Sequence, residues 1–155
     1  MINPQDINLP SMLIHVVFST KHQEPLITEE IRDLLYSFLS GVLEGIHCLV
    51  VEIGGTSDHI HLLTSLDVNI SLDDYIETVK SRSADWVNDR LNLEVPFAWQ
   101  ESYAAFSVGQ WSADELRERI RNQTEIHRHK SFQEEFIELL EENGVDDYDV
   151  DELWD

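Results

Sequence analysis

The order in which strand-like and helical segments alternate is the feature that most restricts how this chain can fold. Four segments rich in β-branched and aromatic residues are strand candidates, and the middle two flank a Gly-Gly turn region typical of a hairpin: 12–21, 47–55, 58–66 and 97–108. Two segments repeat apolar residues at helical spacing: 28–45 and 71–91. The resulting order, β-α-β-β-α-β, predicts an α+β fold with a ferredoxin-like antiparallel sheet and helices packed on one face.

Two further helices are predicted after the last strand. Ser112 and Ser131 each open a Ser-x-x-Glu pattern, a signature of a helix start, and predict helices over 112–130 and 131–144. Residues 145–155 are too charged to fold alone, although Trp154 could hold the end of this tail. No internal repeat or linker is evident. We therefore expect one domain over 1–144 followed by an acidic tail over 145–155.

Charge is distributed unevenly along the chain. The formal net charge is -21, from 31 acidic and 10 basic residues, and taken alone it argues against nucleic acid as a partner. However, five of the ten basic residues lie between Arg117 and Lys130, and the 11 acidic residues after Lys130 are accompanied by no Lys or Arg. The distribution predicts a local basic segment that could meet DNA, and an acidic tail that could fold back on that segment and compete with DNA.

The hydropathy, the N-terminal segment and the cysteine content favour a location in the cytoplasm. No apolar run approaches membrane-spanning length, and the first ten residues lack the pattern of a signal peptide. Cys48 is the single cysteine, so an internal disulfide is impossible and a buried thiol is expected. We expect a cytoplasmic protein with no membrane partner.

Two histidines in "GGTSDHIHLL" are the first candidates for chemistry. Side chains alternate along a strand, so His59 and His61 share one face while Ile60 and Leu62 share the other. Two neutral imidazoles pointing the same way can bind one divalent metal. A half-buried strand with two solvated histidines is the alternative.

A third ligand would have to come from elsewhere, and the predicted helix 112–130 offers candidates. Gln123 and His127 are one turn apart and share a helix face, and His129 follows. The alternative for Gln123, and by default the favoured one, is an exposed surface residue of the helix.

Four blocks of sequence, in their order and separation, identify a resemblance over nearly the whole chain: "HVVFSTK", "GGTSDHIHLL", "WQESYAAFSV" and "IRNQTEIHRHKSFQEEF". They resemble the single-tyrosine HUH transposases of small bacterial insertion sequences and their REP-associated relatives. The resemblance implies an HUH endonuclease fold in which His59 and His61, with Gln123, bind Mg or Mn as the catalytic metal. It also implies single-stranded DNA with hairpins as substrate, cleavage and rejoining through a covalent phosphotyrosine, and a homodimer.

The chain departs from this family at the nucleophile. The family tyrosine lies one turn before the glutamine, in a pattern like Tyr-Ile-x-Asn-Gln, whereas this chain reads "RIRNQ" with Arg119 at that place. A guanidinium stays protonated and cannot attack phosphorus. Three explanations stay open: a DNA-binding relative without catalysis, which we favour; another tyrosine as nucleophile; or a metal-dependent hydrolase that uses water. Tyr103 is the first alternative tyrosine, ahead of Tyr75 and Tyr36.

Four basic residues are candidates for contacts with DNA phosphates. Arg119 would lie beside the scissile phosphate, and arginine pairs well with phosphate. Arg121 and Arg128 belong to the basic segment, and Lys80 lies on the predicted helix 71–91. Pairing with acidic neighbours on the same helix, or a solvated helix face, is the alternative reading for these residues.

Overall fold

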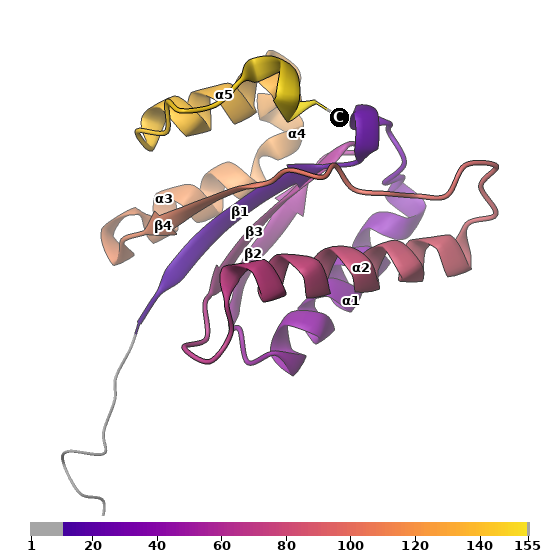
Figure 1. Ribbon diagram of the computed structural model, residues 1–155, viewed down its shortest axis with the longest axis horizontal. Coiled ribbons are helices and arrows are strands. Elements are labelled where there is room, and N and C mark those ends of the chain that lie inside the picture. Colours follow the sequence, from indigo (N-terminus) through magenta and orange to yellow (C-terminus); the bar gives the residue numbers. More distant parts are fainter. Residues whose placement is uncertain (1–10, 155) are drawn as a thin grey trace, which may run out of the picture.

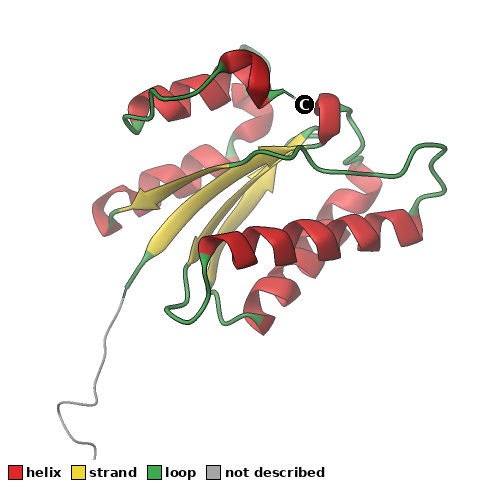
Figure 2. Cartoon of the chain, viewed as in Figure 1, coloured by secondary structure: helices red, strands yellow, loops and turns green. Residues whose placement is uncertain are grey.

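A four-stranded antiparallel sheet forms the centre of the protein, whose computed structural model describes residues 11–154 (Figure 1). The strands are ordered β2-β3-β1-β4 across the sheet: β1 (Leu13–Ser19), β2 (Val50–Gly55), β3 (His59–Ser65) and β4 (Ala104–Val108). The predicted α+β class with an antiparallel ferredoxin-like sheet is confirmed (Figure 2). The first ten residues, which carry the prediction of no signal peptide, and Asp155 lie outside the described residues.

One side of the sheet is apolar and is covered by two long helices, α1 (Glu29–Gly45) and α2 (Leu72–Arg90). Alternation along the strands sends Val16 and Phe18 of β1, and Ile60 and Leu62 of β3, to this side, where all four are fully buried. We call it the apolar face. Helix α2 begins as expected, because the Ser71 side chain accepts a hydrogen bond from the backbone N–H of Asp74.

The opposite side carries the histidines, and we call it the histidine face. It is covered by the C-terminal helices α3 (Gln110–Arg121), α4 (Gln123–Ile126) and α5 (Phe132–Glu142), which Figure 1 shows across the sheet from α1 and α2. Helices therefore cover both faces rather than one. The reason is a second apolar cluster, in which strand residues pack against α5: Val17, Ala104, Phe106, Phe132, Phe136, Leu139 and Leu140.

Three predicted boundaries are corrected by the structure. The helix predicted over 112–130 begins earlier, with Gly109 as its N-cap, so the capping box proposed at Ser112 is wrong. It also ends at Arg121, and after Asn122 the short helix α4 follows. The strand predicted over 97–108 is regular only from Ala104, although Trp99 forms an isolated bridge with Thr20. The capping box at Ser131 is confirmed.

The segment 145–154 packs against the domain. Its end forms a short 3-10 turn, η3 (Val150–Leu153), and the Trp154 ring lies 5.5 Å from that of Phe136 in α5. The carbonyl of Leu153 accepts a hydrogen bond from Nε2 of Gln100 at 3.0 Å. The boundary between a domain and a tail at residue 144 stays a prediction. Within residues 11–154, no helix has the length and apolar character needed to cross a bilayer.

Candidate metal centre

The histidine pair on β3 lies on one side of the sheet, as the alternation predicts. His59 and His61 stand opposite Ser19 and Val17 of β1, and their side chains are 0% and 1% exposed. The alternative of two solvated imidazoles is therefore wrong. Their burial comes from the C-terminal helices: the His59 ring lies 4.6 Å from the ring of Phe132 at the start of α5.

Gln123 meets this pair because the helix breaks just before it. Asn122 ends α3, and Gln123 starts α4 with its side chain 1% exposed. Its Oε1 lies 2.7 Å from Nε2 of His59 and 2.9 Å from Nε2 of His127. The structure thus brings together the glutamine and the first histidine, although they are 64 residues apart in sequence. His129, the other helical candidate, is exposed and lies near Glu125.

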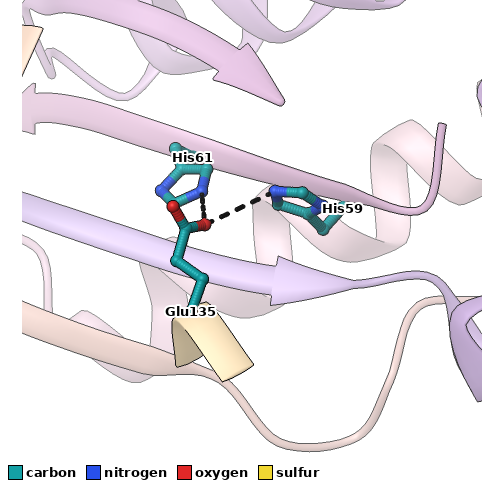
Figure 3. A group of neighbouring side chains, drawn as sticks. All are labelled: His59, His61 and Glu135. Carbon is teal, nitrogen blue, oxygen red and sulfur yellow. Dashed lines mark hydrogen bonds and ion pairs between the residues drawn. The ribbon is translucent and has the colours of Figure 1, made fainter. Parts of the chain in front are cut away.

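Glu135 of α5 completes the cluster, as Figure 3 shows. Its Oε1 lies 2.9 Å from Nε2 of His61 and 3.7 Å from Nε2 of His59. Its Oε2 accepts a hydrogen bond from Nε2 of Gln123 at 3.0 Å. One potential ligand atom from each of His59, His61 and Glu135 lies within 4.8 Å of the others.

Each of the three imidazoles has one ring nitrogen, Nδ1, that points away from the cluster and is hydrogen-bonded to another group. We call it the outer nitrogen and Nε2 the inner nitrogen. Nδ1 of His59 lies 2.7 Å from Oδ1 of Asp58, and Nδ1 of His61 lies 2.8 Å from Nε2 of His15. Nδ1 of His127 lies 2.8 Å from the carbonyl oxygen of Lys130. Metal-binding histidines in proteins use their outer nitrogen in this way, which fixes the ring and directs the inner nitrogen at the ion.

The donor chemistry fits a cation. The Asp58 carboxylate can only accept, so Nδ1 of His59 donates to it, and in the tautomer that carries its proton on Nδ1 the lone pair of Nε2 faces the cluster. The amide of Gln123 donates to Glu135, so its oxygen also presents lone pairs to His59. Lone pairs that face each other at 2.7 Å repel unless a proton or a metal ion lies between them. The residues present therefore fit a divalent ion.

The charges of the cluster follow from burial and hydrogen bonding. Burial lowers the pKa of His61 to about 4, and it lowers the pKa of His15 well below its usual value, with the neighbouring His61 adding to the effect. Burial alone would raise the pKa of Glu135, but hydrogen bonds from His127, His61 and Gln123 outweigh it and hold that pKa far below its usual range. At neutral pH the centre thus contains a carboxylate and at least one neutral imidazole.

Arg119 borders the centre. It lies in the last turn of α3, where Nη1 donates to Oε2 of Glu142 at 3.1 Å and Nε lies 4.0 Å from Oε2 of Glu135. It also lines an open cleft of about 290 Å³ between β4, α3 and α5, together with His15 and Phe106. The position predicted for the nucleophile is therefore next to the buried cluster and reachable from the cleft.

The other basic candidates lie apart from the centre. The Arg121 guanidinium donates to Glu52 and Glu118, each at 3.1 Å, and Arg128 pairs with Glu125 at 3.0 Å. The Lys80 ammonium lies over the Phe18 ring and donates to the three backbone carbonyls of residues 100–102. The structure gathers none of these three around His59 and His61.

The three tyrosines predicted as alternative nucleophiles are not part of the histidine centre. Tyr36, Tyr75 and Tyr103 all pack with the core of the apolar face. The Tyr75 hydroxyl bonds with Thr64 at 2.8 Å, that of Tyr103 donates to Asp73, and burial raises the pKa of Tyr36 to about 12. Within residues 11–154, no tyrosine hydroxyl is hydrogen-bonded to the histidine cluster.

This fold, with a histidine pair on a central strand and a glutamine from a following helix, is that of a DNA transposase. Residues 8–123 match the family described as IS200-like transposases, and the chain belongs to this family. The match ends at Gln123, so α5 and Glu135 lie beyond it. A search of curated proteins finds no significant match.

Two solved structures share the fold. A candidate transposase from Deinococcus radiodurans R1 superposes with a TM-score of 0.63 at 20% identity, covering 79% of this chain and 98% of that one. A REP-associated tyrosine transposase bound to a REP hairpin superposes with a TM-score of 0.59 at 8% identity, covering 82% of this chain and 74% of that one. The predicted HUH-type fold is confirmed by these neighbours.

Glu135 was not predicted from the sequence to be part of the site, and His15 was assigned no role in it. A signal for Glu135 does exist. It lies three residues after Phe132 and four before Leu139, so it shares the apolar stripe of its helix, where a charged residue needs a buried partner.

Proposed function

We propose that this family member binds single-stranded DNA at a divalent ion, Mg or Mn, held by His59, His61 and Gln123. The observation that carries the proposal is the 2.7 Å approach of the Gln123 oxygen to the inner nitrogen of His59, beside a second imidazole on the same strand face. Such an ion, when bound, polarises a phosphate and withdraws charge from it. The chain's own residues hold and orient the ion through their outer hydrogen bonds.

Arg119 is the residue that we expect to bind the phosphate. It lines the open cleft, its side chain is 28% exposed, and its guanidinium is held by a surface carboxylate, Glu142. A phosphate can replace that carboxylate, because both accept paired hydrogen bonds from arginine. Arg121 and Arg128 would add contacts along the DNA backbone. Lys80 could contact the DNA backbone only if its ammonium group left the backbone carbonyls that it binds.

An arginine at this position leaves the centre without a covalent nucleophile. The protein would then bind DNA without forming a phosphotyrosine link, as a DNA-binding relative of active transposases. Hairpin-bearing DNA is the appropriate probe, because one structural neighbour is a REP-associated transposase bound to a REP hairpin. We expect a homodimer, which sedimentation of the free protein would test.

The experiment compares wild type with Arg119→Tyr on hairpin-bearing single-stranded DNA and Mn. Wild type should bind DNA in a metal-dependent manner and give no covalent adduct on a denaturing gel, whereas Arg119→Tyr should give one. Arg128→Tyr is the matched control, since it makes the same substitution at an exposed site and should give no adduct. Free cleaved ends with wild type would instead indicate hydrolysis by water. Metal-independent DNA binding that survives His59→Asn would overturn the proposal.

A further inference from the structure

Glu135 is a buried acidic side chain whose closest partners are two histidines and a glutamine, with Arg119 at the limit of ion-pair distance. Its side chain is 0% exposed, and it comes from α5, beyond the segment that matches the family. In the part of the chain that the structure describes, its hydrogen-bond partners are His61, His127 and Gln123, and the nearest guanidinium nitrogen, Nε of Arg119, is 4.0 Å away. A buried carboxylate is costly unless a cation compensates it, and the two imidazoles are cations only when protonated.

The position of the carboxylate is close to that expected of a ligand. Atoms bound to one ion at about 2.1 Å lie about 3.0–3.4 Å from each other in tetrahedral or octahedral geometry. Oε1 of Glu135 lies 2.9 Å from Nε2 of His61 and 3.7 Å from Nε2 of His59, one distance just below this range and one just above it. Gln123 holds the other carboxylate oxygen. Figure 3 shows the remaining oxygen, Oε1, directed at the two histidines.

We propose that Glu135 is an anionic ligand of the ion at His59 and His61, so that metal binding fastens α5 to the histidine face. This inference rests on the proposed function, because it requires an ion at the histidine pair. It makes the centre a set of two imidazoles, one amide oxygen and one carboxylate. Mg prefers an octahedral shell of oxygens and retains several waters, whereas Mn also accepts imidazole. The set therefore favours Mn over Mg.

Metal affinity is the first test. Metal-stripped protein is titrated with Mn by calorimetry, and bound Mn is followed by its electron paramagnetic resonance signal. Glu135→Gln should weaken Mn binding by about 100-fold or more, since even the loss of an outer partner of a metal ligand costs about 10–100-fold. Glu141→Gln makes the same charge change at an exposed position of α5 and should bind as wild type does. Glu135→Asp shortens the side chain by one methylene group. Its Mn affinity should lie between those of Glu135→Gln and Glu141→Gln.

Fastening of α5 is the second test. Amide hydrogen exchange of residues 132–142 should slow when Mn is added to wild type and to Glu141→Gln, but not to Glu135→Gln. This readout compares each protein with and without metal, so a general loss of stability in a variant does not imitate the expected result. If Glu135→Gln does not fold, the exchange measurement on wild type and Glu135→Asp decides.

Failure of this inference can be told apart from failure of the proposed function. If His59→Asn abolishes Mn binding while Glu135→Gln and Glu135→Asp bind Mn as wild type does, Glu135 is not a ligand and the histidine centre stands. If none of these variants changes Mn binding, both proposals are wrong. Mg binding as tight as Mn binding would overturn the metal preference alone.

Discussion

The two faces of the sheet are built from the same strands but differ in what they bury. On the apolar face, Ile60 and Leu62 pack beneath α1 and α2 among aliphatic and aromatic side chains. On the histidine face, their neighbours His59 and His61 are equally buried, yet they contact polar and charged groups. Burying polar and charged groups on the histidine face is unfavourable. The apolar face supplies the stability that offsets this cost.

The largest expected effect comes from breaking the apolar face. Leu62→Ala removes a fully buried side chain and should lower the free energy of unfolding by roughly 2–5 kcal/mol. Mn affinity of the folded variant should stay unchanged, because Leu62 points away from the histidines. Denaturant unfolding and Mn titration measure the two quantities. Equal damage to both would mean that the faces are not separable.

Acid should lower the stability of the protein through the buried histidines of the histidine face. The pKa of His61 is about 4 in the folded protein against 6.5 for an ordinary histidine, so between these values the unfolded chain binds a proton that the folded protein does not. The stability of the metal-free protein is therefore complete above about pH 6.5 and falls as the pH drops towards 4, by up to roughly 3 kcal/mol for this group.

Denaturant unfolding at several pH values measures this slope. His15 and Glu135 act in the same direction, because their pKa values are also lowered, whereas the raised pKa of His127 opposes them. His61→Asn should flatten the slope, and the exposed His129→Gln should leave it unchanged. The same slope in His61→Asn as in wild type would contradict the assignment.

A glycine at the edge of the sheet tests how closely the histidine face depends on α3. A Cβ built on Gly54 of β2 would lie 2.5 Å from the backbone oxygen of Ile120, so α3 would have to shift. Gly54→Ala should cost about 1–3 kcal/mol and, because α3 leads into Gln123, should also weaken Mn binding. Gly41→Ala in α1 is the control. It meets no atom within 4 Å and should stabilise the protein by about 0.5–1 kcal/mol.

The smallest loss of stability should come from removing a helix-capping serine. There is one such serine on each face of the sheet. Ser71 caps α2 and Ser131 caps α5, and each accepts a hydrogen bond from a backbone N–H. Either Ser→Ala change should cost about 1 kcal/mol in thermal or denaturant unfolding. Only Ser131→Ala should also weaken Mn binding, since α5 carries Glu135. An equal effect of both caps on Mn binding would mean that α5 has no special link to the ion.

Much of the fold was predictable from local patterns. Residue content and periodicity locate β1, β2, β3, α1 and α2 to within a few residues, although β4 is shorter than predicted. Alternation along β3 places His59 and His61 on one face. The break at Asn122 was not predicted, because the sequence on both sides favours helix; in the structure α3 and α4 both pack against β2.

The centre was predictable only in part. Gln123 follows from a resemblance and not from its spacing, since nothing local says which helix will cross which strand. Glu135 lies in an acidic stretch that resembles a solvated helix, and its burial depends on tertiary contacts with β3. A charged residue within the stripe of Phe132, Phe136 and Leu139 was the available signal.

The separation of the cluster along the chain bears on how the protein matures. His61 and Glu135 are 74 residues apart, and closing so long a loop is entropically unfavourable until the strands between them have paired. During synthesis, β3 emerges well before α5, so His59 and His61 are present before Glu135 can contact them. The coordination that we propose for Glu135 would therefore form only as one of the last events of folding, after the two histidines are in place.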